Sequence, residues 1–234
     1  FAIPLAKRGY DVLLYDISDG MLQSAQQAAL AEGIGLKTKK GSVTNLEGIA
    51  NDSFDAVIMM NGVLDYCGDH RKALYEALRV LVPGGLIIGN VNNRFAYSTA
   101  LELAKLGDLT LFNEVMHEGN RLIRWGDAPE GHVTHEFTME ELSHLLEQEF
   151  KSSFKYSFGY VKILGVFNLL GKYFNDKNIL QRMNKTRFFE LQLEFAQIPE
   201  YINNSTDFFF VGQRTLKTRP LTPLERLIKY GPDF

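Results

Sequence analysis

The stretch from Phe54 to Asn90 holds two short apolar runs with a helical pattern between them. The first run, Phe54–Met60, ends at Asn61-Gly62, and the second, Leu86–Ile88, follows Pro83-Gly84-Gly85. Strand, helix and strand in this order are typical of a βαβ unit whose strands are covered on both faces. Ligands of such sheets bind at the carboxyl ends of the strands, so the residues that follow each run are the first candidates for a site.

Two more strands are expected before this unit, over residues 11–15 and 35–40, with Ser18 capping the helix between them. The alternation of strands and helices predicts an α/β domain with a parallel sheet. Residues 1–8 have the pattern of a helix already under way. We therefore expect that the natural beginning of the protein lies upstream of Phe1.

The pattern weakens after Arg94. We expect a helix over residues 95–106 and then a long loop with short helical pieces up to residue 137. Thr138 and Glu141 form a capping box, because Thr138 can accept from the backbone three residues on while Glu141 reaches back. This pattern predicts a helix that ends near Phe150.

The last third of the chain is predicted to hold strands over residues 154–161 and 207–212. Residues 163–204 between them carry two helical patterns, which suit a helical cap over a pocket or a dimer face. We interpret residues 1–234 as one domain with two insertions, a loop and helical insertion over 95–137 and the helical cap over 163–204.

The composition argues against several classes of protein. The net charge of −3 gives no sign of a nucleic-acid surface, and no apolar run reaches the ~20 residues of a membrane span. Cys67 is the single cysteine, which suits a reducing compartment and favours a cytoplasmic location.

Asp16 is the first residue with chemistry in prospect, because it ends an expected strand. A carboxylate at that position can accept hydrogen bonds from two neighbouring ribose hydroxyls. The alternative is that Asp16 only supports the start of the helix behind Ser18.

Three segments in order resemble the class I S-adenosylmethionine-dependent methyltransferases that act on small molecules. They are LAKRGYDVLLYDIS, FDAVIMMNGVLDY and ALRVLVPGG, of which RVLVPGG is the most specific. The resemblance implies a Rossmann-like sheet with helices on both faces and an antiparallel last strand. It also implies that the first strand and the glycine-rich loop are missing from this chain, so we expect residues 1–234 alone to bind the cofactor poorly.

The resemblance further implies S-adenosyl-L-methionine as cofactor and assigns its contacts. Asp16 would bind the ribose, Ile17 would pack on the adenine, and Ser42 would stand where the family often has an acidic residue. The full set of expected cofactor-binding residues is Asp16, Ile17, Ser18, Ser42, Val43, Asn61, Gly62 and Val63.

His135 is the candidate catalytic residue. Methylating a hydroxyl or an amine requires loss of a proton, and a histidine with a pKa near ~6.5 suits that task. A solvated loop histidine is the equal alternative for His135, and we interpret His70, His117 and His144 as surface residues. The spacing of His132 and His135 does not match a helical zinc motif, so no metal site is expected. Candidate substrate-binding residues are Arg94, His132 and Tyr66, with Arg94 suited to an acidic group.

The sequence thus predicts methyl transfer to an oxygen or nitrogen of a small molecule, with no nucleic-acid partner and with a homodimer as one option. One alternative is an NAD-dependent Rossmann oxidoreductase, which also places an acid after the second strand. RVLVPGG and the aromatic last strand argue against it. The other alternative is a non-catalytic methyltransferase-like binding module, which Ser42 and the missing loop would favour.

Overall fold

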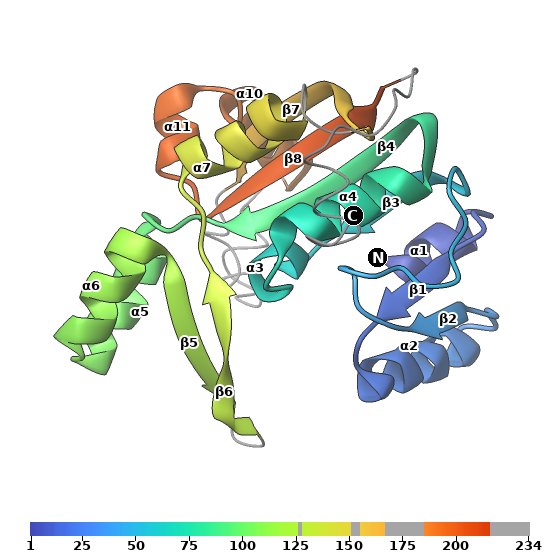
Figure 1. The fold of residues 1–234 in the computed structure, drawn as a ribbon, viewed down its shortest axis with the longest axis horizontal. Coiled ribbons are helices and arrows are strands. Elements are labelled where there is room, and N and C mark those ends of the chain that lie inside the picture. Colours follow the sequence, from blue (N-terminus) through green and yellow to red (C-terminus); the bar gives the residue numbers. More distant parts are fainter. Residues whose placement is uncertain (126–127, 151–154, 167–184, 216–234) are drawn as a thin grey trace, which may run out of the picture.

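The structure is a computed structural model that describes residues 1–125, 128–150, 155–166 and 185–215. These residues form an α/β fold in which helices flank a two-stranded and a four-stranded sheet, and a β-hairpin stands apart from both (Figure 1). The predicted fold class is thereby confirmed. Among the described residues, no helix has the length and apolarity needed to cross a membrane.

The amino-terminal part of the chain forms the two-stranded parallel sheet. It comprises α1 (Ala2–Lys7), β1 (Leu13–Asp16), α2 (Asp19–Ala31) and β2 (Lys37–Lys40). Ser18 caps α2 by accepting a hydrogen bond from the backbone N–H of Met21, as its position in the sequence predicts. Because β1 and β2 are parallel, Asp16 and Lys40 end side by side.

The four-stranded sheet has the order β3-β4-β8-β7. Its strands are β3 (Phe54–Met59), β4 (Leu81–Asn92), β7 (Phe158–Val166) and β8 (Asp207–Arg214). β3 and β4 are parallel and are joined through α3 (Val63–Tyr66) and α4 (His70–Val80), so the βαβ unit is confirmed. β8 runs antiparallel to β4 and β7, as expected of the last strand. Within the described residues, no hydrogen-bonded pairing joins β1 to β3.

The main core lies on one face of the four-stranded sheet. α4 buries Leu74 and Leu78 completely, at the four-residue spacing of one helical face. They belong to one apolar cluster with Ile87 of β4 and Phe210 of β8. Helix α7 (Met139–Ser143), the π-helical stretch η1 (His144–Glu149) and α11 (Pro199–Asn203) also contribute to this cluster. The face is therefore covered by segments that are far apart in the sequence.

The helix expected over residues 95–106 is observed as α5 (Tyr97–Leu106). The described residues of 107–137 form a helix and a β-hairpin, so the long loop predicted there is wrong. These elements are α6 (Leu109–Glu118), β5 (Asn120–Trp125) and β6 (Ala128–His135). Asp108 caps α6, and left-handed Gly107 and Gly119 end α5 and α6. Neither hairpin strand has more than two apolar residues in succession, so no apolar run marks them. Their antiparallel ladder, for example Arg121 opposite Thr134, supplies the order instead.

The capping box at Thr138 and Glu141 is confirmed, with both reciprocal hydrogen bonds present.

The second insertion agrees only in part with the sequence prediction. β7 continues to Val166, so the helical pattern that we placed at Ile163 and Val166 is wrong there, since Ile163 pairs with Phe210 across the sheet. The second helical pattern is observed as α10 (Lys185–Phe195) followed by α11. Residues 167–184, which complete the first pattern, lie outside the described residues, and the cap function stays a prediction.

Gly89 gives a test of this packing, because a Cβ atom there would meet the ring of Phe210 and lie 3.1 Å from the carbonyl oxygen of Met59. We expect Gly89→Ala to lower the free energy of unfolding by about 1–3 kcal/mol, the usual cost of overpacking. Urea denaturation measures this. Gly35→Ala is the matched control, since nothing lies within 4 Å of its Cβ position, and an equal loss in both variants would contradict the proposed packing.

Candidate active site

Asp16, the residue expected to bind the ribose, stands at the end of β1. Oδ1 of the half-buried Asp16 accepts a hydrogen bond from the backbone N–H of Ser18 at 2.8 Å, so this carboxylate does support the helix start. Ile17, which follows it, is 70% exposed, which is unusual for so apolar a side chain. An exposed apolar side chain next to a carboxylate suits a ligand that has both a planar ring and hydroxyl groups.

The loop after β2 begins beside this strand end, because the N–H of Gly41 donates to the carbonyl oxygen of Asp16 at 3.0 Å. The structure therefore brings Ser42 and Val43 close to Asp16, as the sequence predicts. The Ser42 hydroxyl lies 2.8 Å from the Thr44 hydroxyl and also accepts from the Thr44 N–H. Val43 packs against the main core.

The corner after β3 has two consecutive residues in the left-handed region, Asn61 with φ 63° and Gly62 with φ 77°. The backbone N–H of Asn61 donates to Oδ1 of Asn90, at 2.8 Å, and Gly62 is the N-cap of α3, which begins at Val63. The tight corner thus turns the chain from the end of β3 into a helix. Left-handed backbone is common for glycine and tolerated by asparagine, which explains the two residue types.

Polar residues, several of them buried, surround this corner. Asn90 and Asn92 follow the second apolar run, where the sequence predicted a site, but Asp65, Glu136 and Asp207 were missed. Oδ1 and Oδ2 of Asp65 in α3 accept from the backbone N–H of Asn92 at 3.1 and 3.3 Å. Burial raises the pKa of Asp65 to about 8, aided by the charges of Glu136 and Asp207. Burial likewise raises the pKa of Asp207 to about 6, although a hydrogen bond from the Asn90 side chain opposes this. The sequence signal for Asp207 is its position at the start of β8, whereas Asp65 in α3 and Glu136 after β6 carry no comparable signal.

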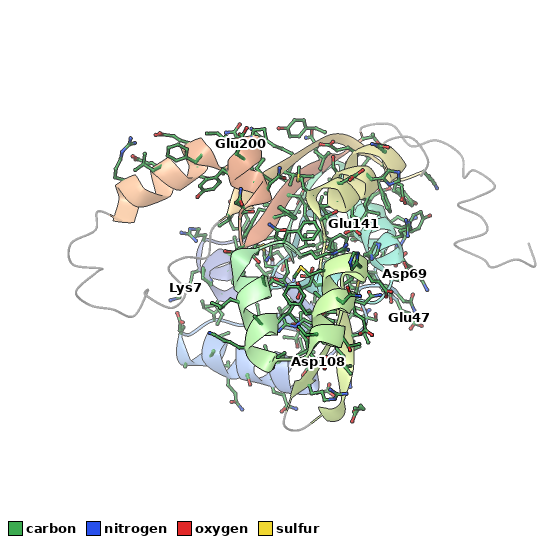
Figure 2. All side chains as sticks on the ribbon, turned by 90° about the vertical axis from the view of Figure 1, so that its left-hand side faces the viewer. Lys7, Glu47, Asp69, Asp108, Glu141 and Glu200 are labelled. Atoms are coloured by element: carbon green, nitrogen blue, oxygen red, sulfur yellow. The ribbon has the colours of Figure 1, made fainter. Side chains whose placement is uncertain are left out.

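A cavity of about 790 Å³ lies between α4, η1 and the base of the hairpin. Figure 2 looks onto this side of the molecule and labels Glu141 and, near it, Asp69, the N-cap residue of α4. The cavity combines aromatic, apolar and titratable side chains. Its lining residues are His70, Arg71, Arg94, Phe95, His135, Phe137, Thr138, Met139, Glu140, Glu141, His144, Leu145, Glu149 and Asn203.

His135 lies in the wall of this cavity. Its Nδ1 lies 3.2 Å from Oδ1 of Asn120, and its Nε2 lies 3.8 Å from Oε2 of Glu141. Burial lowers the pKa of His135, and the charge of Arg94 adds to this while Glu141 opposes it. The imidazole is therefore neutral at pH 7. Since the amide oxygen of Asn120 can only accept, Nδ1 carries the proton in this arrangement and Nε2 has the free electron pair.

Two more histidines line the same cavity. His144 is exposed, as the sequence suggested, but His70 is half-buried, so the surface position expected for it is wrong. The ring of His70 lies 5.6 Å from that of His135, and Phe137 contacts both rings edge-on. Burial and the neighbouring His135 lower the pKa of His70. His144 bonds to Oε1 of Glu149 at 3.2 Å. No group of side chains among the described residues has the makings of a metal site.

Arg94 is buried, and its guanidinium is used within the protein. It donates to both carboxylate oxygens of Glu141 at 2.6 and 2.7 Å, to the carbonyl oxygen of Glu136 and to that of His117. A substrate carboxylate would have to displace Glu141 to reach it. The geometry thus favours a structural role over the acid-binding role suggested by the sequence.

Tyr66 and His132 are brought together, as befits two residues predicted for one site. Nε2 of His132 lies 2.7 Å from the carbonyl oxygen of Tyr66, and the two rings stack with centroids 5.8 Å apart. These contacts dock β6 against α3. Tyr66 is the last residue of α3, the helix that begins at the Asn61-Gly62 corner, and His132 contacts Tyr66. Neither residue is among the cavity-lining residues.

Residues 1–89 match the sequence profile of a family described as the methyltransferase domain. The match covers the amino-terminal residues, less than half of the chain, and includes β1, β3 and the Asn61-Gly62 corner. The fold matches a solved S-adenosylmethionine-dependent methyltransferase from Methanosarcina mazei at 21% identity, with a TM-score of 0.59, over 93% of this chain and 88% of that one. The methyltransferase family implies S-adenosylmethionine as cofactor, and it argues against the nicotinamide oxidoreductase considered from the sequence.

Three curated proteins are similar to this chain over part of its length. An uncharacterised protein of Mycobacterium tuberculosis is 36% identical over 86 residues, which are 37% of this chain and 31% of that protein. A ubiquinone biosynthesis O-methyltransferase of a Caulobacter species is 30% identical over 44% of this chain and 40% of its own. A tRNA 5-carboxymethoxyuridine methyltransferase of Escherichia coli is 32% identical over 37% of this chain and 33% of its own. The chain therefore spans about a third of the length of the curated relatives that it matches.

The Arg94–Glu141 ion pair predicts how the stability of the protein changes with pH. Burial raises the pKa of Glu141, but the Thr138 N–H and Arg94 outweigh it, so the pKa lies below its ordinary value. The stabilisation by this carboxylate is present above the ordinary glutamate pKa of ~4.3 and is lost as the pH falls through the lower folded-state value. We expect Glu141→Gln to cost about 1–2 kcal/mol at pH 7, after allowance for its partial exposure, and little at pH 3.

Urea denaturation at several pH values measures this difference. Glu140→Gln is the matched control, because Glu140 is the neighbouring, exposed glutamate, and it should leave the pH profile of stability unchanged. A Glu141→Gln profile that runs parallel to that of the wild type from pH 7 to pH 3 would contradict the assignment.

Proposed function

We propose that the protein transfers the methyl group of S-adenosylmethionine to an oxygen or nitrogen of a small molecule. The observation that carries this proposal is the pairing of two features. A strand-end carboxylate and a left-handed corner stand at positions for which the sequence resemblance implies cofactor contacts. A cavity of about 790 Å³ with a neutral histidine in its wall lies beyond the carboxyl end of β4.

The residues at the strand ends fit the proposed cofactor. The Oδ2 atom of Asp16 can accept from a ribose hydroxyl while Oδ1 holds the Ser18 N–H, and the exposed Ile17 offers an apolar surface to the adenine. The Asn61-Gly62 corner, with Val63 behind it, would line the methionine end. When bound, S-adenosylmethionine supplies an electrophilic methyl group on a sulfonium. The protein's task is then to hold the acceptor in line with that group.

His135 is the proposed general base. Nε2 would take the proton that the acceptor hydroxyl or amine loses as its new bond to carbon forms. The carbonyl oxygen of the Asn120 amide keeps the other ring proton on Nδ1. Glu141, whose Oε2 lies 3.8 Å from Nε2, would stabilise the resulting imidazolium.

We infer that the methyl acceptor is a small molecule. A cavity of this volume is in the range that encloses small ligands, and the net charge of −3 does not favour a polyanion such as RNA. One relative acts in ubiquinone biosynthesis and another on tRNA, so both acceptor classes belong in the test. A cytoplasmic location and a homodimer remain predictions.

Asp16→Ala tests the cofactor site. Loss of one or two charge-assisted hydrogen bonds should weaken binding of S-adenosylhomocysteine by about 10–100-fold, as measured by calorimetry on the full-length protein. Asp11→Ala is the control, because Asp11 is an exposed aspartate that precedes the same strand and pairs with Lys37. Equal affinity in Asp16→Ala and the wild type would place the ribose elsewhere.

His135→Gln tests the base. We expect kcat on a methyl acceptor to fall by about 10²-fold, with the affinity for S-adenosylhomocysteine unchanged. Because burial lowers the pKa of His135, kcat/KM of the wild type should rise with pH, and the midpoint of this rise should lie below pH ~6.5. The variant should lack this rise.

His117→Gln is the control for this measurement, since His117 is an exposed histidine at the end of α6. The acceptor panel should contain phenols, amines and tRNA. Wild-type protein that binds S-adenosylhomocysteine but methylates no member of the panel would favour the non-catalytic binding module, and turnover of tRNA alone would replace the small-molecule acceptor.

A further inference from the structure

We propose that Asn90 and Asp207 are positioning residues that hold the Asn61-Gly62 corner in its cofactor-binding conformation. The inference rests on the proposed function, because that function makes this corner one wall of the cofactor site. Neither residue would touch the reacting atoms. Their effect would pass through the backbone N–H of Asn61.

The Asn90 side chain is fixed at both of its ends. Its Oδ1 accepts from the Asn61 N–H at 2.8 Å, so its amide nitrogen must point elsewhere. That nitrogen is available to the Asp207 carboxylate, its diagonal neighbour in the β4–β8 ladder, and a hydrogen bond from Asn90 lowers the pKa of Asp207. Asn90 is 8% exposed, which leaves little room for water to replace either partner.

The sheet brings these residues to one place. In the antiparallel β4–β8 ladder, Asp207 stands opposite Asn92, so Asn90, two residues away on the same face, is its diagonal neighbour. β3 lies on the other edge of β4, with Met59 opposite Gly89. The amide of Asn90 therefore links the first residue of β8 to the corner after β3, across three adjacent strands.

The corner needs such a link because Asn61 has a left-handed φ of 63°. This conformation is unfavourable for a residue that carries a side chain, so it persists only where the surroundings fix it. The side chain of Asn61 is exposed, so core packing does not hold it in place. The hydrogen bond from its backbone to Asn90 is the contact that opposes relaxation of the corner.

The charge on Asp207 sets the strength of the link. The groups that face it are Asn90 of β4 and Asp65 of α3. Asp65 in turn faces Glu136, the residue after β6, which pairs with Arg121 of β5 at 3.2 Å. The pKa of Asp207 is about 6 and that of Asp65 about 8. At pH 7, Asp207 is therefore mostly charged and Asp65 mostly protonated, so the Asn90 amide donates to a carboxylate. As the pH falls through 6, Asp207 becomes a neutral acid, and its hydrogen bond with the Asn90 amide weakens.

A reciprocal exchange of the two side chains tests the inference. Asn90→Asp alone keeps an acceptor for the Asn61 N–H but sets two carboxylates against each other, and we expect the Kd for S-adenosylhomocysteine to rise at least about tenfold. Adding Asp207→Asn restores one amide and one carboxylate in the same space. The double variant should bind within about threefold of the wild type.

The matched control is Asn93→Asp. Asn93 is also buried, and its amide nitrogen donates to the carbonyl oxygens of Asn203 and Ser205, but it makes no contact with the corner. This variant should lose thermal stability without a change in Kd beyond about twofold. Equal weakening of binding in Asn93→Asp and Asn90→Asp, or no rescue in the double variant, would overturn the positioning role.

A second measurement does not require the cofactor. The Asn90 hydrogen bond lowers the pKa of Asp207, so Asn90→Ala should raise that pKa in carbon-detected NMR titrations. If the wild type does not bind S-adenosylhomocysteine, the proposed function fails, and a raised pKa would still establish the Asn90–Asp207 link. If binding occurs and the pKa does not move, the link itself is refuted.

Discussion

The hydrogen bonding of β4 on both of its edges is the constraint on which the candidate site depends. One edge pairs in parallel with β3 and the other pairs antiparallel with β8. The register on each side fixes where neighbouring strands end relative to Asn90 and Asn92. Polar groups from three strands therefore meet at one end of the sheet, and the buried position of that end explains why the carboxyl groups of Asp65 and Asp207 ionise with difficulty.

A second constraint is the buried guanidinium of Arg94. It joins the carbonyl oxygen at the end of α6, the carbonyl oxygen after β6 and the carboxylate at the start of α7. A single cation thus ties the hairpin to the helices, and the wall that carries His135 inherits its position from that ion pair. Removing such a buried partner typically destabilises a protein, because the remaining charge is left unpaired.

Local patterns made much of the fold predictable, including the βαβ unit, the Ser18 cap, the capping box at Thr138 and the polar residues at the ends of β1 and β3. The hairpin was missed because its strands lack an apolar run and are ordered by pairing with each other. The grouping of His70 with His135 was missed for another reason. It arises where α4 packs beside β6, and no spacing within either segment records that contact.

The separate hydrogen bonding of the two sheets has a consequence for ligand binding. Asp16 belongs to the β1–β2 pair and Asn61 follows β3, and in the described part of the chain no ladder joins these sheets. A ligand held by both would add a cross-link between two sheets that share no strand pairing in the described residues. Part of its binding free energy would then be spent on ordering them, and amide protons in both sheets should become slower to exchange together when the ligand is present.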